Sequence, residues 1–145
     1  MFKHILLPTD GSPLSEEAIR KGVQFAKSIN AKVTGFYALP EFHIVTYRTD
    51  MLEDTRASFA KDSQAQAQKY LGVIEKLAKE AGVACEIVQA TSDHPYEAIL
   101  KTAQEKGCDL IVMASHGRRG VRGLLLGSET QNVLTHTKLP VLVCG

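Results

Sequence analysis

The sequence predicts an α/β fold, in which a five-stranded parallel β-sheet carries helices on both faces. Short apolar runs rich in β-branched residues alternate with longer segments whose apolar residues recur at helical spacing. The order is strand, helix, strand, helix, through to a fifth strand, and such alternation requires right-handed crossovers between parallel strands. The chain has 145 residues, 44% of them hydrophobic. We therefore expect one domain, residues 1–145, with a substantial core.

The first strand is predicted over residues 2–8 (FKHILLP), and a turn follows it. The next helix is predicted to begin at Ser12 and Pro13, because proline at the first helical position lacks only a donor that would have no partner. Apolar residues then keep helical spacing as far as Asn30. This pattern predicts a helix with one buried stripe.

The second strand is predicted over residues 32–39 and ends at Pro40. Residues 40–50 have no clean periodicity and are predicted to form a long exposed loop. Loops of this length in a compact domain are often functional, so this one is a candidate lid or partner surface. From residue 51 to residue 81 the pattern is helical, and Gly82 is expected to cap the end of that helix.

The remaining elements continue the alternation. They are a strand over residues 84–90, a helix that opens within residues 91–95 and ends at Gly107, a strand over 110–114, a helix over about 128–137 and a strand over 139–144. The run at 110–114 is continuous and apolar, which is typical of a strand buried on both faces of a sheet.

A basic, glycine-rich loop follows the fourth strand, with three glycines and three arginines in residues 117–123. Glycines let backbone N–H groups approach a ligand, and arginines add charge-assisted hydrogen bonds. Ser128, with Gln131 three positions later, is predicted to form a capping box that begins the next helix. A strand, a basic glycine-rich loop and a helix N-terminus together predict an anion site, and we expect the phosphates of a nucleotide there. For each of Arg118, Arg119 and Arg122 taken singly, a solvated surface position is the alternative.

The ends of two strands should meet at this site. In open parallel sheets, ligands bind beyond the carboxyl ends of the strands, where the strand order reverses. Asp10 follows the first strand and Ala114 ends the fourth. Asp10 could contact a ligand or a metal, or could be a turn residue that only caps the local backbone. Its place at the carboxyl end of a strand favours a role in binding.

Composition and charge exclude several classes of protein. The 17 basic and 16 acidic side chains give a net charge of +1, which argues against a nucleic-acid-binding protein. Apolar stretches are all shorter than the roughly 20 residues that span a membrane, and the N-terminus does not have the pattern of a signal peptide. We therefore expect a cytoplasmic protein. Cys85, Cys108 and Cys144 have neither disulfide-framework nor zinc-site spacing and are expected to be small buried hydrophobic residues.

Catalytic and protein-bound metal sites are not expected. Ser115 and His116 are adjacent, and neighbouring residues in an extended segment point to opposite sides, while no GxSxG motif is present. The other histidines show no metal-ligand spacing; they are His4, His43, His94 and His136. A metal ion, if any, would be Mg²⁺ that enters with the nucleotide and is held mainly by its phosphates.

The chain resembles the universal stress protein family over essentially its full length. The resemblance rests on ILLPTDGS at residues 5–12, on the glycine-rich loop, and on LPVLV at residues 139–143. The nucleotide-binding branch of that family has the signature Gly, two residues, Gly, nine residues, then Gly followed by Ser or Thr. Gly117, Gly127 and Ser128 match it, whereas Ala114 occupies the first position. A methyl group there would weaken binding if the position needed a positive φ, and would be harmless if Ala114 ends a strand with negative φ, the alternative that we favour.

The family resemblance implies a flavodoxin-like (Rossmann-like) sheet of order 3-2-1-4-5 that binds ATP, or ADP or AMP, with or without Mg²⁺. Carried over by position, Pro8 and Asp10 would approach the ribose and adenine, and the backbone of Ala38 would meet the base. The phosphates would lie between the loop and the start of the last helix. The implied nucleotide-binding residues are Pro8, Thr9, Asp10, Ala38, Ala114, Ser115, His116, Gly117, Arg118, Arg119, Gly120, Gly127, Ser128, Glu129 and Thr130.

The resemblance also implies a homodimer. In this strand order the last strand, residues 139–144, lies at an apolar edge of the sheet, and such an edge needs a partner. The same strand of a second subunit would supply one, which gives a symmetric dimer.

Three functions are consistent with the sequence. The first is an ATP-binding regulatory protein of the stress response, a dimeric sensor or switch. The second is an enzyme, either a slow ATPase or an adenylyl-transfer relative, although the chain has neither a Walker lysine nor a general base paired with a nucleophile. The third is a dimeric interaction protein that binds no nucleotide, an alternative that Ala114 keeps open. We favour the first.

Overall fold

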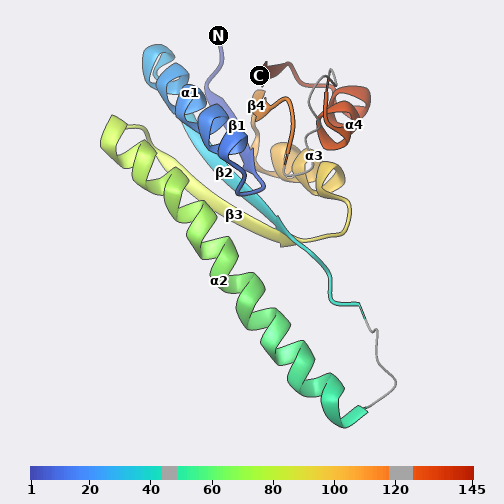
Figure 1. Ribbon diagram of the computed structural model, residues 1–145. Helices are drawn as coiled ribbons and strands as arrows, with labels where there is room; N and C mark the ends of the chain where they lie inside the picture. The colour runs from blue at the N-terminus through green and yellow to red at the C-terminus, as the bar shows by residue number, and fades with distance from the viewer. Residues whose placement is uncertain (44–48, 118–125) are drawn as a thin grey trace.

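The computed structural model describes residues 1–43, 49–117 and 126–145, with backbone alone for residues 49–54. Strands and helices alternate along the chain as predicted (Figure 1). The elements are β1 (His4–Thr9), α1 (Pro13–Ile29), β2 (Lys32–Leu39), α2 (Thr49–Ala81), β3 (Cys85–Thr91), α3 (Pro95–Lys106), β4 (Leu110–Ala114), α4 (Ser128–His136) and β5 (Val141–Cys144).

The five strands form one parallel sheet of order β3-β2-β1-β4-β5. The predicted strand order is therefore confirmed. From β1 the chain moves to one side of the sheet through β2 and β3, and then returns to the other side of β1 for β4 and β5. The order thus reverses between β1 and β4, and their carboxyl ends flank the place where ligands bind in such sheets.

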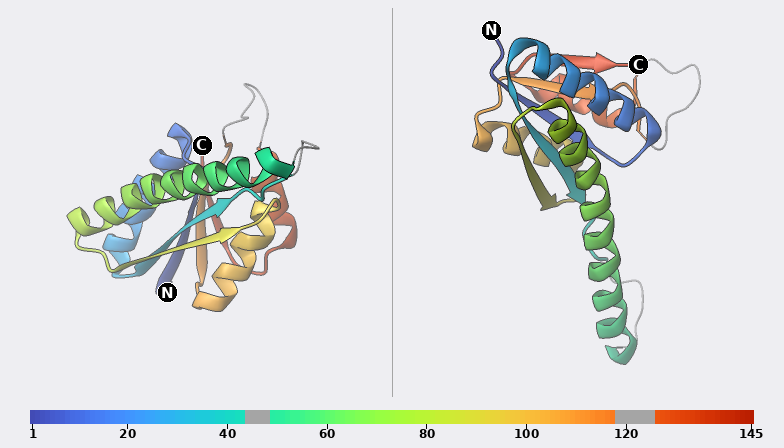
Figure 2. Two further views of the ribbon diagram at one scale, coloured as in Figure 1. Left: turned by 90° about the horizontal axis from the view of Figure 1, so that it is seen from below. Right: turned by 90° about the vertical axis from the view of Figure 1, so that its left-hand side faces the viewer.

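Helices cover both faces of the sheet (Figure 2). On one face, α1 and α2 pack over a core that includes Ile5 and Leu7 of β1, while the opposite core includes Leu6 and Ile111 and is covered by α3 and α4. Side chains along a strand alternate between the two faces. A strand covered on both sides is therefore buried along its length, which is consistent with the apolar runs at Ile5–Leu7 of β1 and Leu110–Ala114 of β4.

The ends of the first helix are formed as predicted. The Ser12 side chain accepts a hydrogen bond from the Ser15 backbone N–H at 3.2 Å, and Pro13 is the first helical residue. Asn30 ends α1 in the left-handed conformation with φ of 58°. Other boundaries differ slightly from the predicted ones: β1 begins at His4 instead of residue 2, and β5 begins at Val141 instead of residue 139. Pro140 has no N–H to donate, which is consistent with the later start of β5.

Helix α2 is longer than the sheet that it covers. It has 33 residues, which corresponds to about 50 Å at 1.5 Å per residue, and its first part extends beyond the sheet (Figures 1 and 2). The segment between β2 and α2 therefore ends at residue 48 instead of residue 50, and its residues 44–48 lie outside the described part. The Phe42 ring lies 5.4 Å from the Phe59 ring, and the Arg56 guanidinium lies 5.2 Å from the Phe42 centroid. The chain leaving β2 is therefore held against the extended part of α2.

Burial shifts the pKa values of two cysteines and one histidine. Cys108 is buried as expected, whereas Cys85 and Cys144 are only partly buried beside the core. Burial raises the pKa of the Cys85 and Cys108 thiols to about 11, so both are protonated at neutral pH. His4 Nε2 lies 2.6 Å from Thr34 Oγ1, and desolvation, followed by the charge of Lys32, lowers the His4 pKa.

Within the described residues, no helix has both the length and the apolar character needed to cross a bilayer.

Candidate functional site

A cleft of about 460 Å³ lies at the carboxyl ends of β1 and β4, where the strand order reverses. Its volume lies within the range of small-molecule sites. The lining comes from the ends of β1, β2 and β4, from the turn after β3, and from the first turns of α1, α3 and α4. The lining residues are Pro8, Thr9, Asp10, Ser15, Phe36, Ala38, Asp93, Pro95, Ile99, Met113, Ala114, His116, Gly117, Gly127, Ser128, Glu129 and Thr130.

Asp10 connects the turn after β1 to the loop after β4. Its Oδ1 accepts a hydrogen bond from the Ser12 backbone N–H at 2.9 Å, so the turn-capping role is present. Its Oδ2 lies so close to Gly117 that a Cβ at position 117 would be 2.3 Å from it. A side chain at position 117 would therefore displace the Asp10 carboxylate, which glycine leaves in place. Asp10 also lines the cleft, and its role in binding stays a prediction.

Gly127 closes the base of the glycine-rich loop. Its N–H donates to the Ser115 carbonyl at 2.7 Å, and a Cβ on it would lie 3.2 Å from His116 Cα and 3.3 Å from the Ser115 oxygen. Its φ of −70° is accessible to any residue. Gly127 is thus needed for close backbone approach and not for a left-handed conformation.

The predicted capping box is wrong. Helix α4 begins at Ser128, and its N-cap is Gly127, whose carbonyl accepts the Gln131 N–H at 3.0 Å. The Gln131 side-chain amide donates instead to the Leu126 carbonyl at 3.0 Å. The long-range bond between Gly127 and Ser115 fixes Gly127 at the cap position, so Ser128 lies one residue inside the helix. Gly127 has no side chain to cap the first turn, and that turn borders the cleft.

Two side chains of this first turn have partners within the protein. The Thr130 hydroxyl donates to the Ala114 carbonyl at 2.8 Å. Glu129 accepts a hydrogen bond from the Tyr96 backbone N–H at 2.9 Å, which joins the first turns of α3 and α4. These bonds hold the wall of the cleft in place. Of the two hydroxyl-bearing residues in this turn, Ser128 is exposed and Thr130 is buried.

Ala114 causes no backbone strain. It is the last residue of β4, is 6% exposed, and lines the cleft. Among the non-glycine residues that the structure describes, only Asn30 has a positive φ. The alternative in which Ala114 ends a strand with negative φ is therefore the one observed.

Ser115 and His116 do not point apart. Ser115 Oγ lies 2.9 Å from His116 Nδ1, so the expectation of opposite orientations is wrong. The strand ends at Ala114, and the alternation of side chains does not continue past that residue. Ser115 is buried and does not line the cleft, whereas His116 does. Among the described residues, the Ser115 hydroxyl therefore contacts His116 and lies away from the cleft.

Most of the residues predicted to bind nucleotide lie around this one cleft. Arg118, Arg119 and Gly120 fall outside the described residues. Ser115 is buried and is not among the residues that line the cleft. Sequence reasoning missed six lining residues: Ser15, Phe36, Asp93, Pro95, Ile99 and Met113. Two signals could have found some of them. Phe36 shares a face of β2 with Ala38, and Asp93 and Pro95 follow the carboxyl end of β3.

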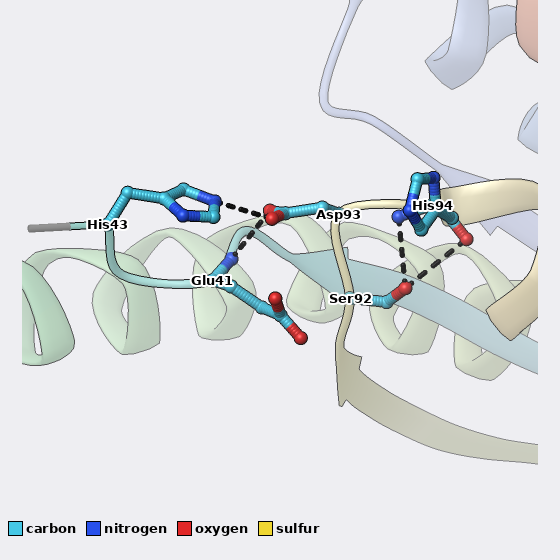
Figure 3. Close-up of polar contacts among 5 residues, drawn as sticks. All are labelled: Glu41, His43, Ser92, Asp93 and His94. Carbon is cyan, nitrogen blue, oxygen red and sulfur yellow. Dashed lines mark hydrogen bonds and ion pairs between the residues drawn. The ribbon is translucent and has the colours of Figure 1, made fainter.

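Asp93 also lies at the rim of the cleft beside residues that follow β2 (Figure 3). Its Oδ1 accepts a hydrogen bond from the Glu41 backbone N–H at 3.1 Å, and its Oδ2 is within hydrogen-bonding distance of His43 Nε2. The Glu41 hydrogen bond, followed by the contact with His43, lowers the pKa of the Asp93 carboxyl group.

The model of the universal stress protein family matches residues 1–145. The chain belongs to the universal stress protein family. Universal stress protein MJ0531 of Methanocaldococcus jannaschii is 31% identical over 143 residues, which cover 99% of this chain and 82% of that protein. A solved structure of MJ0577 from the same organism, also a universal stress protein, superposes with a TM-score of 0.82 at 29% identity, covering 99% of this chain and 95% of that one. A crystal structure of a universal stress protein in complex with cAMP superposes with a TM-score of 0.73 at 28% identity, covering 99% and 97%.

Proposed function

We propose that this universal stress protein binds an adenine nucleotide in the cleft, and that it acts as a regulatory protein of the stress response whose state changes with occupancy. The observation that carries the proposal is the meeting of Asp10, Gly117 and Gly127 beside the N-terminus of α4. Glycine at 117 and 127 lets the loop backbone approach Asp10 and residues 115–116 closely, which supports backbone N–H groups near the cleft. The cAMP complex of a relative that is 28% identical supports an adenine nucleotide as the ligand class.

The cleft offers different surroundings to the two ends of a nucleotide. Pro8, Phe36 and Ala38 give an apolar floor for the base, and Asp10 can accept hydrogen bonds from ribose hydroxyls. The phosphates would lie at the first turn of α4, where unpaired N–H groups and the helix dipole favour an anion. The ligand would be ATP, ADP or AMP, with Mg²⁺ held by the phosphates. Arg118, Arg119 and Gly120 would complete the site within the single domain of residues 1–145.

Titration of the purified protein with ATP and Mg²⁺ by calorimetry tests the proposal. We expect saturable binding that Asp10→Asn weakens about tenfold or more, a loss of about 1.4 kcal/mol or more. Asparagine keeps an acceptor for the Ser12 N–H but removes the carboxylate charge. Glu105→Gln, the same kind of change on an exposed residue of α3, should leave the affinity unchanged.

Two outcomes would contradict the proposal. Absence of binding at millimolar ATP would favour an interaction protein that binds no nucleotide, and equal affinity in Asp10→Asn would place the ligand elsewhere.

A measurement of phosphate release from bound ATP would separate a regulatory protein from an ATPase. ATP that stays intact is expected, and steady turnover abolished by Asp10→Asn would make the protein an enzyme.

We further propose a homodimer formed through residues 139–144. Strand β5 is at the edge of the sheet, and its Leu142 side chain is 44% exposed. Leu142→Lys is expected to convert a dimer to a monomer in light scattering, because a charge would be buried without a partner. Leu134→Lys is the matched control, since Leu134 is 40% exposed and belongs to α4 and not to the edge strand. A wild-type monomer, or a dimer that survives Leu142→Lys, would refute this interface.

A further inference from the structure

Three potential metal ligands meet at the rim of the cleft: Glu41, His43 and Asp93 (Figure 3). One ligand atom of each residue lies within 4.8 Å of the corresponding atoms of the other two. Glu41 and His43 follow β2, whereas Asp93 lies about 50 residues later, in the turn between β3 and α3. The cluster is therefore produced by the fold and not by a local sequence motif.

The sheet fixes the backbones that carry these side chains. β2 and β3 are neighbouring parallel strands whose last paired residues are Leu39 and Thr91, and the Ser92 N–H donates to the Leu39 carbonyl at 2.8 Å. The two segments therefore leave the sheet side by side. The hydrogen bond from the Glu41 N–H to Asp93 extends this pairing beyond the strands. The approach of the three side chains follows from strand register.

The donor set selects a class of metal ion. One imidazole nitrogen and two carboxylate oxygens suit Zn²⁺ and related late first-row ions, whereas Mg²⁺ and Ca²⁺ prefer oxygen ligands alone. Metal–ligand bonds of about 2.0–2.2 Å place the ligand atoms roughly 3–3.5 Å apart around the ion. The three ligand atoms lie within 4.8 Å of one another, and His43 Nε2 contacts Asp93 Oδ2 at 2.5 Å, so a bound ion would replace that contact and would need side-chain rotations.

The charge of the cluster also favours a cation. The carboxylates of Glu41 and Asp93 lie close together. In the described part of the chain, lysine and arginine form ion pairs only with other carboxylates, in the pairs Lys101–Glu105 and Lys106–Glu86. The Arg56 guanidinium lies nearby, over the Phe42 ring, but neither carboxylate is among its ion pairs in the described part of the chain, and His43 contacts Asp93. Neighbouring carboxylates repel one another, and a divalent cation between them removes that repulsion.

We propose that Glu41, His43 and Asp93 bind a divalent transition-metal ion of the zinc class at the rim of the cleft. Three protein ligands leave a coordination position for water or another molecule. Because Asp93 also lines the cleft, a metal here fastens the chain leaving β2 to the turn that begins α3. The site is distinct from any Mg²⁺ carried by nucleotide phosphates at α4. Spacing along the sequence could not indicate it, since the donors come from two distant segments.

Metal titration of the full-length protein, stripped with a chelator and free of nucleotide, tests this site. Calorimetry with Zn²⁺ should show one equivalent bound per chain, and Co²⁺ should give the visible absorption bands of a nitrogen- and oxygen-ligated ion. We expect His43→Ala and Asp93→Asn each to weaken Zn²⁺ binding about tenfold or more, whereas millimolar Mg²⁺ should not compete. Asparagine at 93 keeps an acceptor for the Glu41 N–H, so the turn is retained.

His94→Ala is the matched control. His94 is the next residue in the same turn, and its hydrogen bonds in the structure use backbone atoms. Its removal should leave Zn²⁺ affinity within about twofold of the wild type. Affinity that survives His43→Ala, an equal loss in His94→Ala, or absence of binding at 0.1 mM Zn²⁺, about the limit of a useful site, would overturn the assignment. ATP titration of His43→Ala separates the two proposals, because the nucleotide should still bind there if only the metal site is lost.

Discussion

Gly127→Val is expected to weaken nucleotide binding by roughly ten- to hundredfold while the sheet stays folded. A Cβ at this position would lie 3.2 Å from His116 Cα and 3.3 Å from the Ser115 carbonyl oxygen, and valine adds two further methyl groups. Both neighbours are backbone atoms, so relief requires the base of the loop to open. Overpacking of this kind costs about 1–3 kcal/mol, which corresponds to the expected loss if it falls on the bound state.

ATP titration of Gly127→Val beside Gly72→Val checks this prediction. Gly72 lies in α2, and a Cβ there would meet nothing within 4 Å, so the same substitution should leave ATP affinity unchanged. Circular dichroism establishes that both variants are folded. Wild-type affinity in Gly127→Val would show that the hydrogen bond from Gly127 to Ser115 does not shape the nucleotide site, and the phosphates would have to be placed away from the start of α4.

Local sequence patterns predicted the elements whose cause is local. The apolar runs of β1 and β4 reflect burial on both faces, and Ser12 with Pro13 begins α1 as a capped helix. The predicted capping box at Ser128 failed for a different reason. A hydrogen bond between Gly127 and Ser115, twelve positions apart in the sequence, sets the start of α4, and a pattern of four residues carries no information about that contact.

The same distinction applies to the cleft. The place of Asp10 beside the cleft could be predicted from its position after β1, and that of Gly127 from the glycine spacing of the family that the chain resembles. Asp93 could be assigned only once β3 was known to pair with β2 in a register that brings Thr91 beside Leu39. The rule that neighbouring side chains of an extended segment point to opposite sides failed at Ser115 and His116. Both residues lie beyond Ala114, the last residue of β4, and the rule holds only within a strand.

Gly11→Ala is expected to lower the free energy of unfolding by about 2–5 kcal/mol, from two separable causes. Gly11 has a φ of 81°, where alanine is strained, and its Cβ would lie 2.3 Å from the Tyr70 ring. That ring packs against Tyr37 at a centroid distance of 5.4 Å, so it cannot move without disturbing the core beneath α2. The glycine between Asp10 and Ser12 thus lets the turn of the cleft and the core approach each other.

Urea unfolding of Gly11→Ala, Tyr70→Ala, their double variant and Gly82→Ala separates the two causes. Gly82 has a φ of 73°, and a Cβ there would lie in open space. The loss of stability in Gly82→Ala therefore measures only the cost of alanine at a positive φ, about 1 kcal/mol. In a Tyr70→Ala background, Gly11→Ala should cost little more than Gly82→Ala, because the steric neighbour is gone. A coupling energy near zero between positions 11 and 70 would show that the ring does not constrain the turn. The cost of Gly11→Ala would then be backbone strain alone, and the turn that carries Asp10 would be held by its own hydrogen bonds to Ser12 and Ser15.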